Sequence, residues 1–219
     1  MIGDADWFVE TEKFFGGFVT VKRRAFSKKE GHKIISMMGG DRMGPEHHNY
    51  AAVYAQALEP FVARRMDPLT IVELGILRGS GLAMWSVLFP KATIIGLDLE
   101  PQNCRKMLSR MHRKGAFQNS EPELYEFDQL TATKENFASI IGQRKIDIMV
   151  DDAWHSTEAI LRTFTMAYEF LSDDSIYFAE DNTKVADHLR ALAPDATVEQ
   201  FGQLTTVRNK KGPPKRALV

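Results

Sequence analysis

TIVELGILRGSG, residues 70–81, joins a short apolar run to a helical segment through three glycines. The run TIVEL has the β-branched and apolar residues of a strand that is buried on both faces. Glycines at this point let the chain turn tightly and let a ligand approach the backbone, and the following helix would present free N–H groups. The same turn also occurs for purely structural reasons. The ligand-binding residues expected here are Glu73, Gly75, Gly79 and Ser80.

Short apolar strands alternate with helical segments after this unit. The expected strands cover residues 92–100, 123–129, 145–152 and 174–181, and two closing strands, 197–202 and 204–210, are close enough to form a hairpin. Continuous apolar strands separated by helices indicate a parallel sheet with both faces covered. We therefore expect an α/β, Rossmann-like fold with a seven-stranded, mostly parallel sheet and helices on both faces.

The chain divides into three parts by pattern. Residues 1–65 are expected to form a helical extension or lid. Ser27 and Glu30 have capping-box spacing ahead of HKIISMM, residues 32–38, where a helix is expected, and a second amphipathic helix is expected over residues 50–61. Residues 66–210 form the expected main domain. Residues 211–219 are basic and contain proline, as in a loose tail.

Composition excludes several classes of protein. The formal net charge of −1 gives no global field for nucleic acid or for an anionic membrane, and no apolar stretch is long enough to cross a bilayer. The start of the chain has no signal-peptide pattern. Cys104 is the only cysteine, so no intramolecular disulfide forms; a reducing, cytoplasmic location is expected, and a nucleophilic role for this thiol is disfavoured.

Residues after the second and third strands predict a nucleotide-like cofactor. In open α/β sheets, ligands bind beyond the carboxyl ends of the strands. Asp98 lies about 20 residues after the glycine turn, where a carboxylate can hold ribose hydroxyls, although it could also cap a helix. Asp128 and Gln129 are placed for an adenine edge or for a plain turn. S-adenosylmethionine is favoured over a nicotinamide dinucleotide, because no tyrosine has the lysine four residues later that short-chain dehydrogenases need.

The fourth and fifth strands end in acidic residues that predict a metal site. Asp152 and the pair Glu180–Asp181 fall at adjacent strand ends, and clustered carboxylates need a cation. An all-oxygen site suits Mg²⁺, which leaves positions for substrate oxygens. His155 is placed as a general base, or simply as a helix cap. Since strand residues alternate, Asp151 faces away from Asp152; it is a candidate cofactor-binding residue whose role is open.

The motifs VELGILRGSG, GLDLE and YEFDQ resemble class I S-adenosylmethionine-dependent methyltransferases over residues 45–209. MVDDAWH and YFAEDN resemble elements of metal-dependent sugar O-methyltransferases of the macrocin and mycinamicin type, which share them with cephalosporin hydroxylase-like proteins. GGDRMGPEHHNYAAVYAQALEPF resembles the segment before the core of that group. Catechol O-methyltransferases are more distantly similar. The resemblance implies strand order 3-2-1-4-5-7-6, with Glu73 and Gly75 at the methionine end of the cofactor, Asp98 at the ribose and Asp128 near the adenine.

The resemblance implies an Mg²⁺-dependent O-methyltransferase that acts on a hydroxyl of a small natural product such as a sugar. A phenolic acceptor, a NAD-dependent oxidoreductase and a noncatalytic protein of the same fold are the alternatives. Trp154 would lie beside the cofactor, and Ala153–Trp154 replaces a family Gly-Ser, which predicts a bulkier wall above the metal. His47 and His48 are expected to be loop residues, with contact to the substrate as the alternative, and a part for Asn182 in the site is open. A small-molecule partner is expected, and the oligomeric state is open, with a homo-oligomer as one alternative.

Overall fold

The computed structural model of the chain describes residues 1–16, 18–21, 34–37 and 40–209. Its centre is a seven-stranded sheet in the order β5-β4-β3-β6-β7-β9-β8. When these seven strands are numbered 1 to 7 along the chain, starting from β3, this is the predicted order 3-2-1-4-5-7-6, which is confirmed. The strands are β3 (Thr70–Leu74), β4 (Thr93–Asp98), β5 (Glu123–Glu126), β6 (Ile146–Asp151), β7 (Leu171–Ala179), β8 (Thr197–Phe201) and β9 (Leu204–Arg208). The first five run parallel, and β9 is antiparallel to β7 and to β8.

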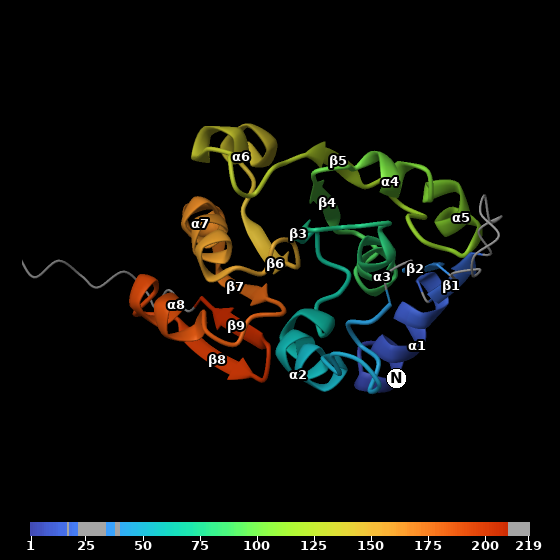
Figure 1. The fold of residues 1–219 in the computed structure, drawn as a ribbon, viewed down its shortest axis with the longest axis horizontal. Coiled ribbons are helices and arrows are strands. Elements are labelled where there is room, and N and C mark those ends of the chain that lie inside the picture. Colours follow the sequence, from blue (N-terminus) through green and yellow to red (C-terminus); the bar gives the residue numbers. More distant parts are fainter. Residues whose placement is uncertain (17, 22–33, 38–39, 210–219) are drawn as a thin grey trace, which may run out of the picture.

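Helices cover both faces of the sheet, as the alternation of strands and helices predicts (Figure 1). One face carries α6 (Lys134–Ile141), α7 (Thr157–Ala167) and α8 (Ala186–Leu192). The other carries α1 (Ala5–Phe15), α2 (Ala51–Val62) and α3 (Ser80–Leu88), and the short helices α4 (Gln102–Arg105) and α5 (Leu108–Arg113) lie near the β4–β5 edge. A 3₁₀ turn, Tyr168–Phe170, follows α7.

Two hydrophobic clusters form the core, one on each face. Alternate residues of β6 divide between them, since Ile148 and Val150 join the cluster under α1, α2 and α3, whereas Met149 joins the cluster under α7. This alternation follows from the period of two along a strand. It also fixes which acidic residues at the strand ends face each side.

The N-terminal segment contains strands as well as helices. β1 (Phe18–Val21) pairs antiparallel with β2 (Ile34–Met37), so the expectation of a helix over residues 32–38 is wrong at 34–37. A short apolar run such as IISM fits either structure by pattern alone, and strand pairing decides between them. The predicted capping box at Ser27 and Glu30 and the basic tail at 211–219 lie outside the described residues.

α1 and α2 share a hydrophobic core with the sheet, because Phe8 and Tyr54 belong to the same cluster as Ile71 and Phe178. Tyr54 stacks on Phe178 with ring centroids 4.2 Å apart. The boundary at residue 65 and the lid role of the first segment stay predictions. Among the described residues, every helix is too short or too polar to cross a membrane.

Candidate active site

Three neighbouring strands bring acidic side chains together at the carboxyl edge of the sheet. β6 lies between β3 and β7, and its pairing continues one residue past each strand end. The Asp152 N–H donates to the Leu74 carbonyl at 2.9 Å, and the Glu180 N–H donates to the Asp151 carbonyl at 3.0 Å. Glu73, Asp152 and Glu180 alternate with residues of the α6–α8 face, so their side chains lie together on the opposite, α1–α3 face.

The glycine turn after β3 is required by close backbone contacts. Gly75 has φ +87°, and a Cβ there would lie 2.1 Å from the Asp152 carbonyl oxygen. Gly79, at φ +84°, is the N-cap of α3, and a Cβ there would lie 2.4 Å from Cys104 Sγ. Burial raises the pKa of the Cys104 thiol to about 12, which opposes a nucleophilic role for this residue.

Glu73 lies under the first turn of α3. A Cβ at Gly81 would be 2.3 Å from its Oε1, and Trp85 Nε1 donates to its Oε2. A buried carboxylate in such a position needs donors on both oxygens. The second donor comes from outside the sheet.

That donor is Arg42, from the loop before α2. Its Nη2 donates to Glu73 Oε1 at 3.1 Å and to Asp152 Oδ2 at 2.7 Å, and its Nε donates to Glu180 Oε2 at 2.9 Å. The Arg42 side chain is 7% exposed, Glu73 and Glu180 are 2% exposed and Asp152 is 26% exposed. We call these four residues the Arg42 cluster. One guanidinium thus joins carboxylates from the ends of three strands.

Burial and charge act in opposite directions on the pKa values of this cluster. Burial by itself would lower the pKa of Arg42, but the carboxylates of Glu180, Glu73 and Asp152 outweigh it and hold that pKa above its ordinary value. Burial raises the pKa values of Asp152 and Glu180, which the Arg42 charge opposes. Tyr54 donates its hydroxyl proton to Glu180 Oε1, so both oxygens of Glu180 have protein donors.

Asp181 is not part of the Arg42 cluster and instead interacts with one tyrosine and two histidines. The Tyr50 hydroxyl donates to its Oδ1 at 2.7 Å, His48 Nδ1 lies 3.1 Å from the same oxygen, and His155 Nε2 lies 3.9 Å from Oδ2. Asp181 and His155 both have left-handed backbone, with φ of 56° and 55°. That conformation costs a non-glycine residue about 1 kcal/mol or more. Successive residues of a regular strand face opposite sides of a sheet. The left-handed backbone instead turns Asp181 toward the cavity, on the same side as Glu180.

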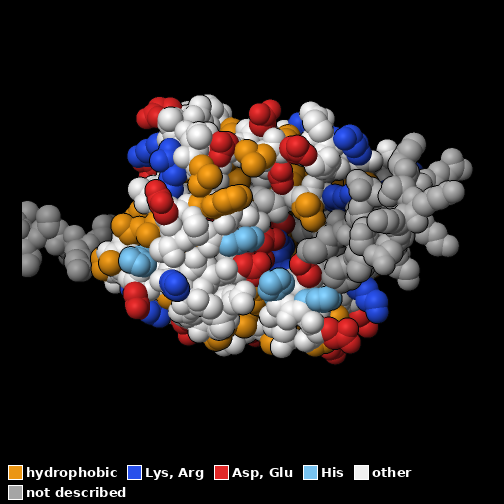
Figure 2. All heavy atoms as spheres, in the orientation of Figure 1, with side chains coloured by type: hydrophobic (Ala, Val, Ile, Leu, Met, Phe, Trp, Pro, Cys, Tyr) orange, Lys and Arg blue, Asp and Glu red, His pale blue; other side chains and the backbone are white. Residues whose placement is uncertain are grey.

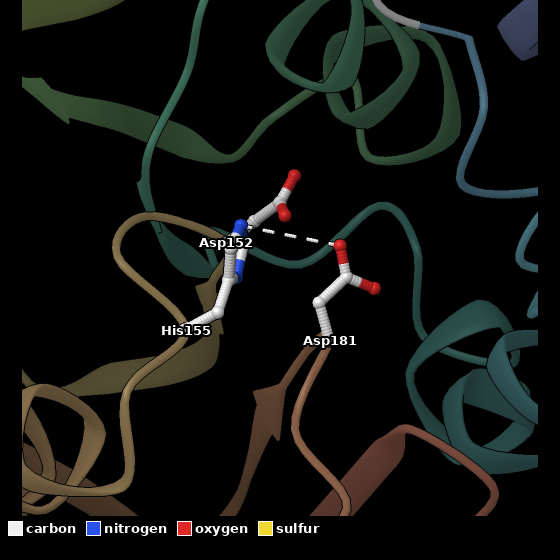
Figure 3. A group of neighbouring side chains, drawn as sticks. All are labelled: Asp152, His155 and Asp181. Atoms are coloured by element: carbon white, nitrogen blue, oxygen red, sulfur yellow. Dashed lines mark ion pairs between the residues drawn. The ribbon is translucent and has the colours of Figure 1, made fainter.

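Asp152, His155 and Asp181 form a group that fits a metal ion, and we call these three residues the cation-binding group (Figure 3). One ligand atom from each lies within 4.8 Å of the others, and the side chains of His155 and Asp181 face one another. His155 Nδ1 is buried without a hydrogen-bond partner, and Asn182 Nδ2 donates to the His155 carbonyl at 2.8 Å. Two carboxylates and an imidazole suit a divalent cation, with Mg²⁺ favoured by the oxygens.

The acidic residues open onto a cavity of about 210 Å³. Figure 2 shows acidic side chains in a hollow, with a basic side chain behind them and histidines at the border. A second cavity, of about 350 Å³, lies next to it and is more apolar. The two share Gly75, Leu77 and Asp152, so they meet at the glycine turn.

The apolar cavity contains the other predicted cofactor residues. Asp98 Oδ2 accepts from the Leu77 N–H at 3.0 Å, and Asp98 Oδ1 accepts from the Glu100 N–H at 2.8 Å. Asp128 accepts from Thr131 and from the Leu130 N–H, and these hydrogen bonds lower its pKa. Both aspartates thus also stabilise their own turns.

Asp151 belongs to a separate network on the α7 face. Both its oxygens accept from Gln129 Nε2, at 2.9 and 3.0 Å, and Oδ2 accepts from the Tyr177 hydroxyl at 2.7 Å. Gln129 Nε2 also donates to Thr163 Oγ1, and Gln129 Oε1 accepts from the Trp154 N–H. Burial raises the pKa of Asp151 to about 6. Through Gln129, this network, which we call the Asp151 network, holds the backbone at Trp154.

Comparison with solved structures identifies the architecture. MycE methyltransferase from the mycinamycin biosynthetic pathway, solved with Mg and SAH, matches with a TM-score of 0.57 and 16% identity, over 80% of this chain and 54% of that one. The fold is that of class I methyltransferases. The O-methyltransferase TomG from Streptomyces achromogenes, solved with SAM, gives a TM-score of 0.52 and 14% identity, over 76% of this chain and 84% of that one.

Two curated proteins are similar in sequence. The 8-demethyl-8-alpha-L-rhamnosyl tetracenomycin-C 2'-O-methyltransferase of Streptomyces olivaceus is 29% identical over 150 residues, which are 65% of this chain and 35% of that protein. The L-olivosyl-oleandolide 3-O-methyltransferase of Streptomyces antibioticus is 25% identical over 126 residues, 54% of this chain and 29% of that protein. The chain spans about a third of their length. The predicted resemblance to sugar O-methyltransferases is confirmed, although no family model matches the chain.

On this methyltransferase fold, most predicted site residues line one of the two cavities. Those at the acidic cavity are Glu73, Gly75, Ser80, Asp152, His155, Glu180 and Asp181. Those at the apolar cavity are Gly75, Asp98, Asp128, Gln129, Asp152 and Trp154. Gly79 and Asp151 line neither. Glu180 lies beside the cation-binding group but is engaged by Arg42 and Tyr54, so its part as a metal ligand stays a prediction.

The methyltransferase fold also shows site residues that the sequence did not single out. Arg42, Tyr50 and Tyr54 contact the acidic residues, and His48 lines the acidic cavity, whereas His47 borders a different cavity next to α1. For Arg42 and His48 the signal was the polar segment GGDRMGPEHHNY, whereas Tyr50 and Tyr54 fall within the apolar helical spacing of residues 50–61, which gave no sign of a role in the site. Asn182 supports the His155 backbone and is itself buried.

Proposed function

We propose that this chain is a metal-dependent O-methyltransferase that transfers a methyl group from S-adenosylmethionine to a hydroxyl of a small natural product, such as a glycosylated metabolite. The observation that carries the proposal is the junction of the two cavities. An apolar cavity beside a glycine turn meets a cavity with Asp152, His155 and Asp181 at its wall. The two curated relatives, both sugar O-methyltransferases by name, support the class of acceptor.

The apolar cavity would hold the cofactor, which supplies the methyl group when bound. Leu77, Leu99 and Leu130 are exposed and border this cavity, as does the 63% exposed Trp154, so apolar surface is available for an aromatic base. Asp98 would accept hydrogen bonds from the ribose hydroxyls. One of its present hydrogen bonds, from the Leu77 or the Glu100 N–H, would then be replaced. Glu73, Gly75 and Ser80 would lie at the other end of the cofactor.

A divalent cation, Mg²⁺ by the oxygen donors, would be held by Asp152 and Asp181, and when bound it would make an acceptor hydroxyl more acidic. His155 is not a ligand of the cation in this proposal, and its Nε2 accepts the proton of the acceptor hydroxyl. The carboxylate of Asp181, 3.9 Å away, then stabilises the imidazolium, and Asn182 keeps the His155 backbone in place. Glu180 is proposed as a further metal ligand.

Cofactor identity is tested by calorimetric titration of the chain with SAH and with NADH, each with and without MgCl₂. We expect saturable binding of SAH and none of NADH. Binding of NADH, or of neither compound, would overturn the methyltransferase proposal in favour of the oxidoreductase or the noncatalytic alternative.

His155→Gln tests the proposed base. We expect methyl transfer to fall by about 10²- to 10⁴-fold, because the variant removes a positioned general base. SAH affinity should stay within about twofold of wild type, because His155 lines the acidic cavity only. A variant with wild-type kcat would exclude His155 as the base.

A phenolic acceptor is the second candidate, favoured by the exposed Trp154 next to Asp152 at the cavity junction. An aromatic acceptor ring can stack on this indole. A panel of glycosylated natural products and catechols, assayed for SAH release, separates the two acceptor classes.

A further inference from the structure

Arg42 lies at the centre of the acidic residues although it comes from outside the sheet. Its partners lie 31, 110 and 138 residues away along the chain, at the ends of β3, β6 and β7. Among the described residues that line the acidic cavity, Arg42 is the one lysine or arginine, whereas Glu73, Asp152, Glu180 and Asp181 all carry carboxylates. The local charge therefore depends on this single guanidinium.

Removal of one partner from a buried ion pair leaves an uncompensated charge, which is strongly destabilising. Here one guanidinium pairs with three carboxylates, two of them almost fully buried. Loss of Arg42 would therefore leave all three carboxylates without their cation. Tyr54 and Trp85 give Glu180 and Glu73 one further hydrogen bond each, but neither carries positive charge.

The guanidinium does not pair with every carboxylate at the wall of the acidic cavity. It contacts Oδ2 of Asp152 and does not contact Asp181, whose Oδ1 accepts from Tyr50. Asp152, His155 and Asp181 consequently remain grouped within 4.8 Å beside an existing positive charge.

We propose that Arg42 is a built-in counter-cation, a positioning residue that holds Glu73, Asp152 and Glu180 in place without a metal, so that the cation-binding group is formed before a metal arrives. The inference rests on the proposed metal site and not on methyl transfer. It has two consequences: the folded protein does not need a divalent cation, and the fixed charge weakens metal binding by repulsion.

Arg42→Met tests both consequences, since methionine keeps much of the apolar stem and removes the charge. Thermal unfolding is measured in EDTA and in MgCl₂, and Mn²⁺ affinity is measured by calorimetry, both without cofactor or acceptor. We expect the variant to lose stability in EDTA and to recover at least half of the loss in MgCl₂. We expect Mn²⁺ to bind at least tenfold more tightly than to wild type.

Two controls separate charge from packing. Arg42→Lys keeps the charge and should unfold with little dependence on the metal. Arg144→Met removes a different ion pair, with Glu123 at 2.7 Å, at the amino ends of the strands, and its stability should not respond to MgCl₂. If Arg42→Met does not fold in EDTA, the double variant Arg42→Met/Glu180→Gln, which removes one carboxylate with the cation, should fold.

The proposal is overturned if the lost stability of Arg42→Met is not recovered by a divalent cation, or if Mn²⁺ affinity is unchanged or weaker. It is also overturned if the double variant fails to fold where Arg42→Met fails. SAH titration of the wild-type chain tests the proposed function by itself, so the two failures are distinguishable.

Discussion

Asp151 and Asp152 are neighbours in sequence and end the same strand, yet they belong to different regions. Asp151 points to the α7 face, into the Asp151 network of Gln129, Tyr177 and Thr163. Asp152 points to the opposite face, into the Arg42 cluster, and borders both cavities. One residue of strand register separates the two environments.

The two regions satisfy a buried carboxylate in different ways. Neutral donors surround Asp151, which is 1% exposed and lines neither the acidic nor the apolar cavity, and burial raises its pKa to about 6. A guanidinium holds Asp152, which stays 26% exposed. The comparison shows that chemistry at a strand end depends on access and on a nearby charge, because the same side chain without them becomes part of the scaffold.

Asp152→Asn gives the largest expected effect on function. We expect methyl transfer to fall by at least about a hundredfold, because the variant removes a proposed metal ligand and the charge that Arg42 pairs with. Mn²⁺ affinity should fall with it. The check is the rate of SAH release at saturating MgCl₂, and an undiminished rate in EDTA would show that no metal acts at this position.

Asp151→Asn makes the same change one residue earlier and should act on stability instead. We expect the free energy of unfolding to fall by about 2 kcal/mol, because buried donors of Gln129 and Tyr177 lose an acceptor. Urea unfolding measures this loss. Mn²⁺ affinity should stay within twofold, and a larger change would mean that the two regions are coupled through Gln129.

Glu12 lies on the Arg42 side and is also buried, at 4% exposed, and its effect is expected to be the most pH-dependent of the three. Burial raises its pKa from 4.5 to about 7, and its Oε2 accepts from the Met43 N–H. The folded state therefore holds this proton more tightly than the unfolded chain. The stabilisation is complete below about pH 4.5 and is lost as the pH rises through about 7.

Glu12→Gln keeps a side-chain oxygen that accepts from the Met43 N–H, but its amide does not ionise. Relative to wild type, the variant should become more stable by about 1 to 2 kcal/mol between pH 5 and pH 8, as measured by urea unfolding at each pH. A difference that does not change with pH would show that Glu12 is ionised in the folded protein throughout.

The sheet was predictable because each strand is a short apolar run between turn formers, and a period of two then places Asp152, Glu180 and Glu73 on one face. The same rule placed Asp151 on the other face but could not show its partners. Gln129 is such a partner: it lines the apolar cavity, but its side-chain amide is hydrogen-bonded to Asp151 and to the Trp154 N–H.

Arg42 could not be predicted, because its contacts span up to 138 residues and no local pattern records them. The strand Ile34–Met37 was missed because a four-residue run with three apolar residues fits a helix equally well. Asp181 reaches the cation-binding group through a left-handed backbone, which sequence alternation does not anticipate.

The left-handed backbone at His155 and Asp181 has a consequence for engineering. Glycine adopts this conformation without the penalty that a side chain carries, so substitution at either position relieves strain while it removes the chemistry. A library of variants selected for heat resistance alone would drift toward glycine at these two positions. Selection for a robust catalyst from this chain therefore has to score cation binding together with melting temperature.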